Sequence, residues 1–447
     1  MSERKRIYLC LAHMSDEGLE QKYIKEAFDT NWVVSLGPNV NGFEADLEAF
    51  VGQDKRVVAL SSGTAAVHLG LLNCDVKPGD EVIVQSFTFC ASTHPVTYLG
   101  AMPVLVDSEE DTWNIDPELL EKAIIDRKEK TGKYPKAIVP VALYGMPYKA
   151  DRIMEIANKY GIPVVEDAAE GMGSRYNGQV LGTFGKYGIL SFNGNKMITT
   201  SGGGALITAN DDEWREIMMY ATQYRESYPY YQHEKIGYNY RMSNICAGIG
   251  RGQMTVVNDH LAHHKHVQKM YEELLKDVPG VHVHSQPTDE WTEVKGQKSK
   301  VYDSNYWLCT ITIDENVKVK GQEDAYKTIV TGAVGGAAGV IHAAASAHTD
   351  SEPNANVEAM RVALDRANIE ARPVWKPMHK QPCYCRGKME EVRCKNYSVV
   401  TSETSVAYVN GVSEGVFKVG MCLPAGPYVT DDDVRYIVDT IKENIIG

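Results

Sequence analysis

A single lysine stands inside a polar, glycine-rich segment at residues 190–204. Ser191, Asn193 and Asn195 precede Lys196, and a run of hydroxyl residues and glycines follows it at 199–204. A lysine amine held among hydroxyls, amides and close backbone suits an imine with the aldehyde of pyridoxal phosphate (PLP). The flanking apolar runs predict two short strands that place the lysine in a loop at a sheet edge. The alternative is an ordinary solvated lysine in a polar loop.

An apolar run that ends in carboxylates lies upstream of this segment, at residues 164–170, after a helical stretch at 151–160 and a turn at 161–163. An acid at the carboxyl end of a buried parallel strand lies where α/β sheets bind ligands. We therefore expect Asp167 to pair with the pyridinium nitrogen of PLP, so that the ring can act as an electron sink. Glu170 is expected near the ring hydroxyl. The alternative is that Asp167 caps the turn that follows it.

Residues 57–71 have the pattern of a strand, a small hydroxyl-rich turn and an apolar helix. The N-terminus of such a helix offers free N–H groups and a positive dipole end, which together bind phosphate. Ser62, Gly63 and Thr64 are the predicted phosphate cradle. The segment is not a P-loop, because it lacks the Gly-x-x-x-x-Gly-Lys spacing. A plain hydroxyl-capped helix is the alternative.

Aromatic residues follow the next predicted strand, at 81–85. A cofactor ring needs an aromatic face on its open side, and Phe89 is the candidate for that contact. Phe87 and Phe89 are equally compatible with an ordinary core, and periodicity does not separate these interpretations.

Taken in order, these motifs resemble those of the nucleotide-sugar aminotransferases, which are fold-type I PLP enzymes that act on keto-sugars attached to a nucleotide. The resemblance runs from residue 7 to residue 424. The shared motifs are Ser-Gly-Thr at 62–64, Ser-Phe-Thr-Phe at 86–89, Glu-Asp-Ala-Ala-Glu at 166–170, Ser-Phe-Asn-Gly-Asn-Lys at 191–196 and Gly-Tyr-Asn-Tyr-Arg-Met-Ser-Asn at 237–244. The loop at 193–204 and the segment 372–379 are most similar to the branch that aminates C4 of a UDP-linked 4-keto-6-deoxy-N-acetylhexosamine, as in bacillosamine-type pathways.

The resemblance implies a role for each matched cofactor residue. Lys196 is implied to be the Schiff-base lysine and the base that moves a proton between the cofactor and the sugar carbon. Asp167 is implied to be the pyridinium partner, with Glu170 beside the phenolic oxygen and Phe89 as the stacking ring. The implied phosphate contacts are Gly63, Thr64 and Ser191, together with Asn239 of a neighbouring subunit.

Substrate contacts are implied mainly at the C-terminal segment, where Trp375, Lys376 and His379 match residues that line the sugar–nucleotide entrance. Trp32 resembles a residue of the active-site rim. Lysine suits a diphosphate as a point charge, and we expect a local cationic cluster to assist it, formed by Arg225, Arg241 and Arg372. The alternative for the segment at 375–377 is that it only packs.

The implied reaction is amino transfer, with L-glutamate as the donor and a UDP-keto-sugar as the acceptor. Related sugar dehydratases carry histidine at the lysine position, so Lys196 favours transamination. A PLP-dependent dehydratase and a non-catalytic PLP- or sugar-binding regulator are the alternatives. Because Asn239 is implied to reach a neighbouring site, the resemblance also implies a homodimer.

Composition excludes several other classes of function. The 447 residues carry a net charge of −13 and contain no large basic patch, so binding to nucleic acid or an acidic membrane is not expected. The chain shows neither a signal-peptide h-region nor an 18-residue apolar run, so we expect a cytoplasmic protein. Nine scattered cysteines argue against a disulfide framework. The spacing of Cys383, Cys385 and Cys394 is not that of a zinc site, and no metal is expected.

The elements that position these residues belong to an α/β protein. Short apolar runs alternate with helical patterns from about 52 to 210, which predicts a mostly parallel sheet covered by helices. Residues 212–277 look largely helical. We expect an N-terminal segment plus a large PLP-binding domain at 1–279, and a smaller α+β domain at 280–447. The small domain should hold a strand near 307–313, a helix at 357–367 and an Ala/Gly-rich insertion at 331–350.

Overall fold

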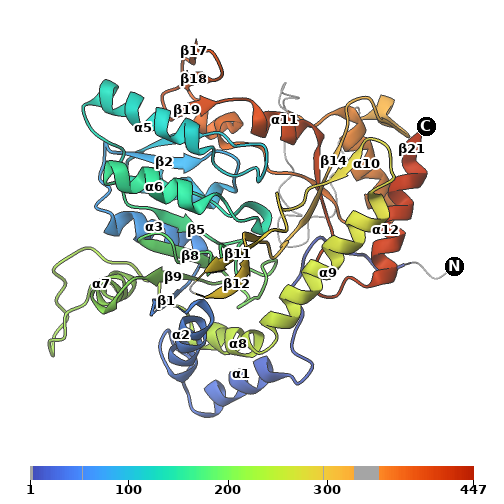
Figure 1. Cartoon of the computed structure of the whole chain (residues 1–447). Helices are drawn as coiled ribbons and strands as arrows, with labels where there is room; N and C mark the ends of the chain where they lie inside the picture. The colour runs from blue at the N-terminus through green and yellow to red at the C-terminus, as the bar shows by residue number, and fades with distance from the viewer. Residues whose placement is uncertain (1–3, 53, 295, 327–351, 447) are drawn as a thin grey trace.

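A computed structural model describes residues 4–52, 54–294, 296–326 and 352–446 (Figure 1). Its centre is a mixed sheet in the order β1-β9-β8-β5-β4-β2-β3-β19-β18-β17, in which isolated parallel bridges join β4 to β5. The bounds are β1 Arg56–Leu60, β2 Glu81–Gln85, β3 Met102–Val106, β4 Ala137–Val139, β5 Val165–Asp167, β8 Tyr187–Ser191, β9 Gly204–Thr208, β17 Glu390–Arg393, β18 Ser398–Thr401 and β19 Val406–Val409.

The middle of this sheet is parallel, as the alternation of strands and helices predicts. β2 pairs in parallel with β3 and β4, and β5 pairs in parallel with β8. β9 departs from the pattern, because it runs antiparallel to both β1 and β8. The β8–β9 pair forms the hairpin whose loop carries Lys196, which confirms the two short strands expected around it.

Both faces of the sheet are buried, because successive strand residues enter different cores. In β1, Val57 and Ala59 pack in one core, whereas Val58 and Leu60 pack in the other. Side chains of α2, α5 and α6 contribute to the first core, and side chains of α3, α4 and α7 contribute to the second. These helices are α2 Pro38–Val51, α3 Gly63–Asn73, α4 His94–Tyr98, α5 Pro117–Thr131, α6 Ala150–Tyr160 and α7 Asp211–Ala221. The central strands are therefore buried on both faces and mostly apolar rather than alternating, with Glu166 and Asp167 of β5 as exceptions.

Helices α7, α8 and α9 confirm part of the helical region expected at 212–277, but residues 222–243 between α7 and α8 are not helical. α8 spans Asn244–Met254 and α9 spans Val257–Leu275. α8 packs on α1, Leu19–Asp29, so closely that a Cβ on Gly252 would lie 2.5 Å from the backbone nitrogen of Glu20. In the part of the chain that the structure describes, none of the helices has the length and apolar character needed to cross a membrane.

A third core lies under the sheet β10-β14-β20-β16, against α9, α10 and α12 (Figure 1). The elements of this core are β10 Val281–Val283, β14 Cys309–Ile313, β16 Arg372–Pro373, β20 Gly420–Leu423, α10 Ala355–Arg366 and α12 Asp431–Asn444. α11 Val412–Val419 instead places Phe417 in the first core. β14 and α10 confirm the strand and helix expected in the C-terminal region. The Ala/Gly-rich insertion at 331–350 lies outside the described residues.

Small hairpins complete the structure. β6 Arg175–Tyr176 pairs with β7 Gln179–Val180 and with β13 Tyr302–Asp303, and β11 Trp291–Val294 pairs with β12 Gln297–Lys300. β15 Lys318–Val319 pairs with β21 Ile445–Ile446.

The C-terminal half of the chain also contributes strands to the large sheet. The expected boundary at residue 280 assigns these strands to the small domain instead. β19 runs parallel to β3, with Val406 opposite Val104 and Tyr408 opposite Val106. Val406 and Tyr408 enter one core of the large sheet, and Ala407 and Val409 enter the other. Residues 390–409 are therefore an extension of the large sheet, and the rest of the expected division stays a prediction.

Candidate active site

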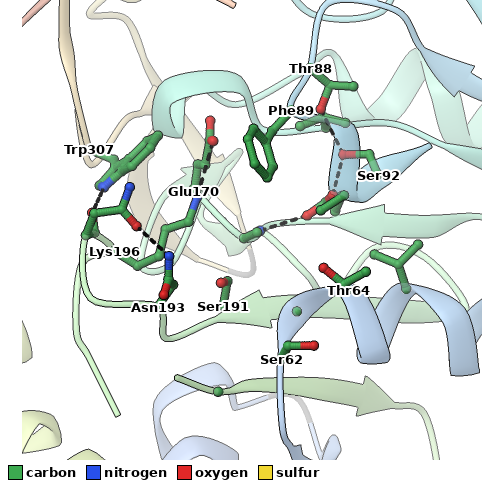
Figure 2. Close-up of a pocket in the computed structure, with 18 of the residues that line it drawn as sticks. Ser62, Thr64, Thr88, Phe89, Ser92, Glu170, Ser191, Asn193, Lys196 and Trp307 are labelled. Atoms are coloured by element: carbon green, nitrogen blue, oxygen red, sulfur yellow. Dashed lines mark hydrogen bonds and ion pairs between the residues drawn. The ribbon is translucent and has the colours of Figure 1, made fainter. Parts of the chain in front are cut away.

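A cavity of about 210 Å³ lies where the ends of several strands and loops of the large sheet meet (Figure 2). Its wall comes from the β1–α3 turn, the segment after β2, the end of β5 and the β8–β9 loop. Two tryptophans from the C-terminal part of the chain complete the lining. The residues expected from the sequence that line it are Ser62, Gly63, Thr64, Phe89, Asp167, Glu170, Ser191, Lys196 and Trp375. Segments far apart in the sequence thus converge on one cavity, as the motif order predicts.

Lys196 projects into this cavity from the β8–β9 loop. Its side chain is only 12% exposed, so the alternative of a solvated surface lysine is wrong. The backbone N–H of Lys196 donates to the carbonyl of Asn193 at 2.9 Å, which fixes the turn. The Nζ atom lies 3.3 Å from Oε1 of Glu170 and 4.1 Å from the ring centroid of Trp307. Figure 2 shows the lysine side chain running between these two groups.

Asp167 ends β5 with its carboxylate buried at the cavity wall. Its Oδ2 accepts a hydrogen bond from the Ser92 hydroxyl at 2.6 Å, and its Oδ1 accepts from the Ala169 N–H at 3.1 Å. The second bond shows that Asp167 also caps the turn that follows it, which is the alternative that the sequence left open. Burial raises the pKa of Asp167, and these hydrogen bonds and the charge of Lys196 oppose the rise. A carboxylate whose pKa is raised by burial is stabilised in its charged form by a cationic N–H partner. The pyridinium of PLP is such a partner.

Glu170 is also buried, and both of its oxygens have partners. Oε1 faces Lys196, and Oε2 accepts from the backbone N–H of Tyr144 at 2.8 Å. Burial raises the pKa of Glu170, and the charge of Lys196 lowers it. Tyr144 has a φ of 54°, and its hydroxyl accepts from the N–H of Trp375 at 2.7 Å. The left-handed residue Tyr144 therefore connects the acid beside the lysine to the tryptophan at the cavity mouth.

The N-terminus of α3 opens onto the same cavity. Ser62 is the N-cap, and its side chain accepts from the N–H of Ala65 at 3.0 Å, so the capping alternative is confirmed for this residue. Gly63 packs so closely on β8 that an added Cβ would lie 3.1 Å from Cβ of Ser191. A Cβ on Gly204 would lie 2.3 Å from the nitrogen of Gly63. This glycine-lined helix start, with hydroxyls beside it, fits a phosphate group.

The two phenylalanines after β2 have different environments, which the sequence left undecided. Phe87 is fully buried in the core, whereas Phe89 is 50% exposed and lines the cavity. The ring centroid of Phe89 lies 5.5 Å from that of Trp375. Phe89 is therefore free to face a bound ring, and Phe87 is a core residue.

Lys376 and His379 do not line the cofactor cavity. Lys376 lies in an adjoining cavity of about 300 Å³, which shares Thr88, Phe89 and Trp375 with it. His379 is buried, with Nδ1 2.7 Å from the Ser86 hydroxyl and Nε2 3.1 Å from a Glu414 oxygen. Lys376 is thus next to the mouth, whereas His379 anchors its own segment.

The three arginines expected to assist the substrate lie outside the lining of both cavities. The Arg241 guanidinium is buried in a bidentate ion pair with Glu44, so its position does not support a diphosphate contact. Arg372 pairs with Glu370 at 2.6 Å, and the guanidinium of Arg225 lies 4.6 Å from the ring centroid of Tyr231.

Trp32 and Asn239 are also outside the cavity of this chain. The carbonyl of Trp32 accepts from the side chain of Asn244 at 2.9 Å, which ties the rim loop to α8. Asn239 forms a bridge with Thr222 at the base of the 222–240 arm. Its predicted phosphate contact therefore requires a second chain.

Ser92 and Trp307 are the main site residues that sequence reasoning missed. Ser92 lies just beyond the Ser-Phe-Thr-Phe motif at 86–89, and nothing in the local sequence distinguishes its hydroxyl from those of its neighbours Thr88 and Thr93. Trp307 lies more than a hundred residues after Lys196 and belongs to no local motif. Among the described residues, no group of three or more His, Cys, Asp or Glu side chains is arranged to hold a metal ion.

Comparison with known proteins places this site in a family. The profile of the DegT/DnrJ/EryC1/StrS aminotransferase family matches residues 15–332. EpsN of Bacillus subtilis (strain 168) is 38% identical over 437 residues, covering 98% of this chain and 95% of EpsN. The name of EpsN gives it a pyridoxal phosphate-dependent aminotransferase activity as a provisional assignment. GDP-perosamine synthase of Caulobacter vibrioides is 30% identical over 446 residues, covering 100% of both chains.

A solved structure shows the same fold. The DegT DnrJ EryC1 StrS aminotransferase from Brucella abortus superposes with a TM-score of 0.75, covering 96% of this chain and 95% of that chain at 24% identity. The profile match and the full-length relatives agree with the lysine, acid and helix N-terminus found in the cavity. The chain belongs to the DegT/DnrJ/EryC1/StrS aminotransferase family, and it is a PLP-dependent aminotransferase with the type I fold.

Proposed function

We propose that the enzyme transfers an amino group from L-glutamate to C4 of a UDP-linked 4-keto-6-deoxy-N-acetylhexosamine. The observation that carries amino transfer is the position of the Lys196 amine, which faces the cavity between Glu170 and Trp307. A lysine at this point, rather than a histidine, supports transamination over dehydration. The resemblance of the 193–204 loop and the 372–379 segment to the C4-aminating branch supports the choice of substrate.

Four groups of this chain would hold PLP. The Asp167 carboxylate would bind the ring nitrogen, Phe89 would cover one ring face, and the start of α3 with Ser191 would bind the phosphate. When bound, PLP supplies an aldehyde carbon that accepts the amino group and a ring that accepts an electron pair. Asp167 would keep a proton at the ring nitrogen, because its carboxylate is buried and accepts only two hydrogen bonds from the protein.

Lys196 performs the proton transfer in this proposal. Its amine would take a proton from the carbon on one side of the transferred nitrogen and return it at the carbon on the other side of that nitrogen. Glu170 lies 3.3 Å away and stabilises the amine while it carries the proton. The Trp307 ring covers the amine on its other side and keeps water from that face. A positioned base of this kind contributes about 10²- to 10⁴-fold to a rate.

Lys376 is the cation best placed for the nucleotide diphosphate. It lines the cavity that adjoins the cofactor cavity, and burial lowers its pKa. A bound diphosphate would favour the charged form of the amine, because it supplies an opposite charge. Trp375 lines both cavities, so in this proposal the sugar lies on the Lys196 side of Trp375 while its diphosphate lies beside Lys376.

The substrate assignment is tested by product analysis with purified enzyme, PLP and L-glutamate. We expect the UDP-linked 4-keto-6-deoxy-N-acetylhexosamine to become the 4-amino sugar, with a kcat/KM at least about tenfold above that of a GDP-linked 4-keto-6-deoxyhexose. The GDP arm is included because the GDP-perosamine synthase is a full-length relative.

Three results would contradict this assignment in different ways. Amination of the GDP-sugar alone would show that the substrate is a GDP-linked rather than a UDP-linked sugar. Loss of a hydroxyl without incorporation of an amino group would favour the dehydratase. Tight PLP binding with no product from any sugar would favour the regulator.

We also propose that the enzyme is a homodimer that shares its sites. Asn239 lies outside the cavity of its own chain, at the base of the 222–240 arm. This arm carries large apolar side chains that are exposed. On this arm Tyr231 is 77% exposed and Ile236 is 86% exposed. Exposed large apolar side chains of this kind mark interaction sites. Sedimentation equilibrium should give twice the chain mass, and a monomer at micromolar concentration would contradict the proposal.

A further inference from the structure

We propose that Tyr144 is a positioning residue for the second half of the reaction, in which the sugar nucleotide receives the amino group. Its hydroxyl holds the backbone at Trp375, so that Trp375 and Lys376 stay where the sugar and its diphosphate would bind. The inference rests on the proposed function, which places the sugar nucleotide at these two residues. Tyr144 itself lies outside the lining of both cavities.

Tyr144 lies in a turn whose backbone is held on both sides. The turn is the short helix η2, Leu143–Gly145, which follows β4. The N–H of Leu143 donates to the buried side chain of Asn114 at 3.0 Å, and the carbonyl of Gly145 accepts from the buried hydroxyl of Ser174 at 2.6 Å. The φ of 54° at Tyr144 is one that a large side chain rarely adopts. A strained residue fixed by its neighbours in this way is a firm support for the groups that it contacts.

The two polar groups of Tyr144 serve opposite sides of the site. Its backbone N–H donates to Oε2 of Glu170 at 2.8 Å, on the side of the lysine. Its hydroxyl accepts from the backbone N–H of Trp375 at 2.7 Å, and the two ring centroids lie 5.9 Å apart. Only the second contact needs the hydroxyl. Phenylalanine at this position would therefore release Trp375 and keep the contact with Glu170.

The mouth segment, residues 374–379, is fastened to the large structure at both ends. The N–H of Val374 donates to the backbone of β20 at 3.2 Å, and the N–H of Met378 donates to the carbonyl that follows β2 at 2.7 Å. Between these ends the N–H of Trp375 is held by a side chain, the hydroxyl of Tyr144. This hydroxyl belongs to a residue that is only 4% exposed, and a buried N–H without an acceptor is costly. Without the hydroxyl, the segment should shift toward another acceptor and carry with it the side chains that face the sugar nucleotide.

The two half-reactions, measured separately by stopped-flow absorbance on the PLP-loaded enzyme, test this inference. In the first, L-glutamate passes its amino group to PLP, and in the second, pyridoxamine phosphate passes it to the UDP-keto-sugar. In Tyr144→Phe we expect the sugar concentration that gives half the limiting rate to rise by about 2- to 10-fold, as for the loss of one hydrogen bond between neutral groups. The limiting rates and the corresponding L-glutamate concentration should stay at the wild-type values, because the contact with Glu170 is kept.

Binding of UDP gives a second readout that needs no turnover. Titration calorimetry of the PLP-loaded Tyr144→Phe enzyme should show a Kd for UDP that rises by the same factor of about 2 to 10. The Kd for PLP should stay at the wild-type value. A general loss of structure would not weaken UDP binding alone.

Tyr271 provides the matched control. It is fully buried on α9, its hydroxyl donates to the carbonyl of Pro424 at 2.9 Å, and it packs in the third core. Tyr271→Phe therefore also loses one buried hydrogen bond between a tyrosine hydroxyl and the backbone, away from both cavities. Both variants should lower the Tm, whereas only Tyr144→Phe should weaken the sugar and UDP.

The outcomes separate this inference from the proposed function. Unchanged values for the sugar and UDP in Tyr144→Phe would overturn the inference, and so would an equal weakening of the L-glutamate half-reaction, which would show a merely structural role. Lys376→Ala tests the proposed place of the diphosphate while it keeps the Tyr144 contact. If Lys376→Ala binds UDP as tightly as the wild-type protein, that place is wrong, and the inference falls with it. Weaker UDP binding in Lys376→Ala with no change in Tyr144→Phe would overturn the inference alone.

Discussion

Replacement of Lys196 by alanine or arginine is expected to lower the rate of amino transfer by at least about a thousandfold. Alanine removes the amine, and the guanidinium of arginine neither forms the imine nor releases a proton near neutral pH. A nucleophile and a proton-transfer base are lost together, and each is worth orders of magnitude in rate. Stopped-flow and steady-state assays with L-glutamate and the keto-sugar measure the loss.

The fold should survive both substitutions, because Lys196 makes one ion pair and packs at a cavity rather than in a core. Circular dichroism and thermal unfolding check this point. Lys186 is the matched control, since it is exposed and lies just before β8 in the same hairpin. Lys186→Ala should turn over at the wild-type rate. Wild-type transamination by Lys196→Ala would show that a different group carries the chemistry.

The second large effect is expected at Asp167. Asp167→Asn and Asp167→Ala should each lower kcat by about 10²- to 10⁴-fold, because the ring nitrogen loses the charge that keeps it protonated. Asparagine nearly preserves the shape of the side chain and can still accept from the Ser92 hydroxyl, so the loss in that variant reports on charge. Turnover at the wild-type rate in Asp167→Ala would remove the assigned role.

Glu166 is the matched control for Asp167, because it is a buried carboxylate at the adjacent position of β5. Its oxygens accept from the backbone N–H groups of Gly182 and Phe184, which hold the turn before β8. Burial raises the pKa of Glu166 to about 7. Glu166→Gln should reduce the free energy of unfolding by about 1–3 kcal/mol, because it leaves a buried N–H without its acceptor. Its kcat should change far less than that of Asp167→Asn.

The sequence predicts the parts of the site that obey local rules. Lys196, Asp167 and the start of α3 each follow an apolar strand, and the ends of neighbouring strands meet at one edge of a sheet. These residues could therefore be placed together before their contacts were known. The roles of Phe87 and Phe89 could not be separated, because only tertiary packing decides which ring meets the core.

Long-range contacts account for what the sequence does not predict. Trp307 reaches Lys196 through a separate segment, and the pairing of Arg241 with Glu44 joins residues almost two hundred positions apart. β19 joins β3 across a still larger separation, so the expected boundary at 280 misses the return of the chain to the large sheet. No periodicity within a short window contains this information.

The most direct test of the account is to locate the covalent attachment of PLP. The purified protein is loaded with PLP, reduced with borohydride, digested and mapped by mass spectrometry. The account predicts that the phosphopyridoxyl group is found on the peptide that contains Lys196, and that Lys196→Ala carries none. A label on another lysine, or no label in the wild-type protein, would contradict the central claim.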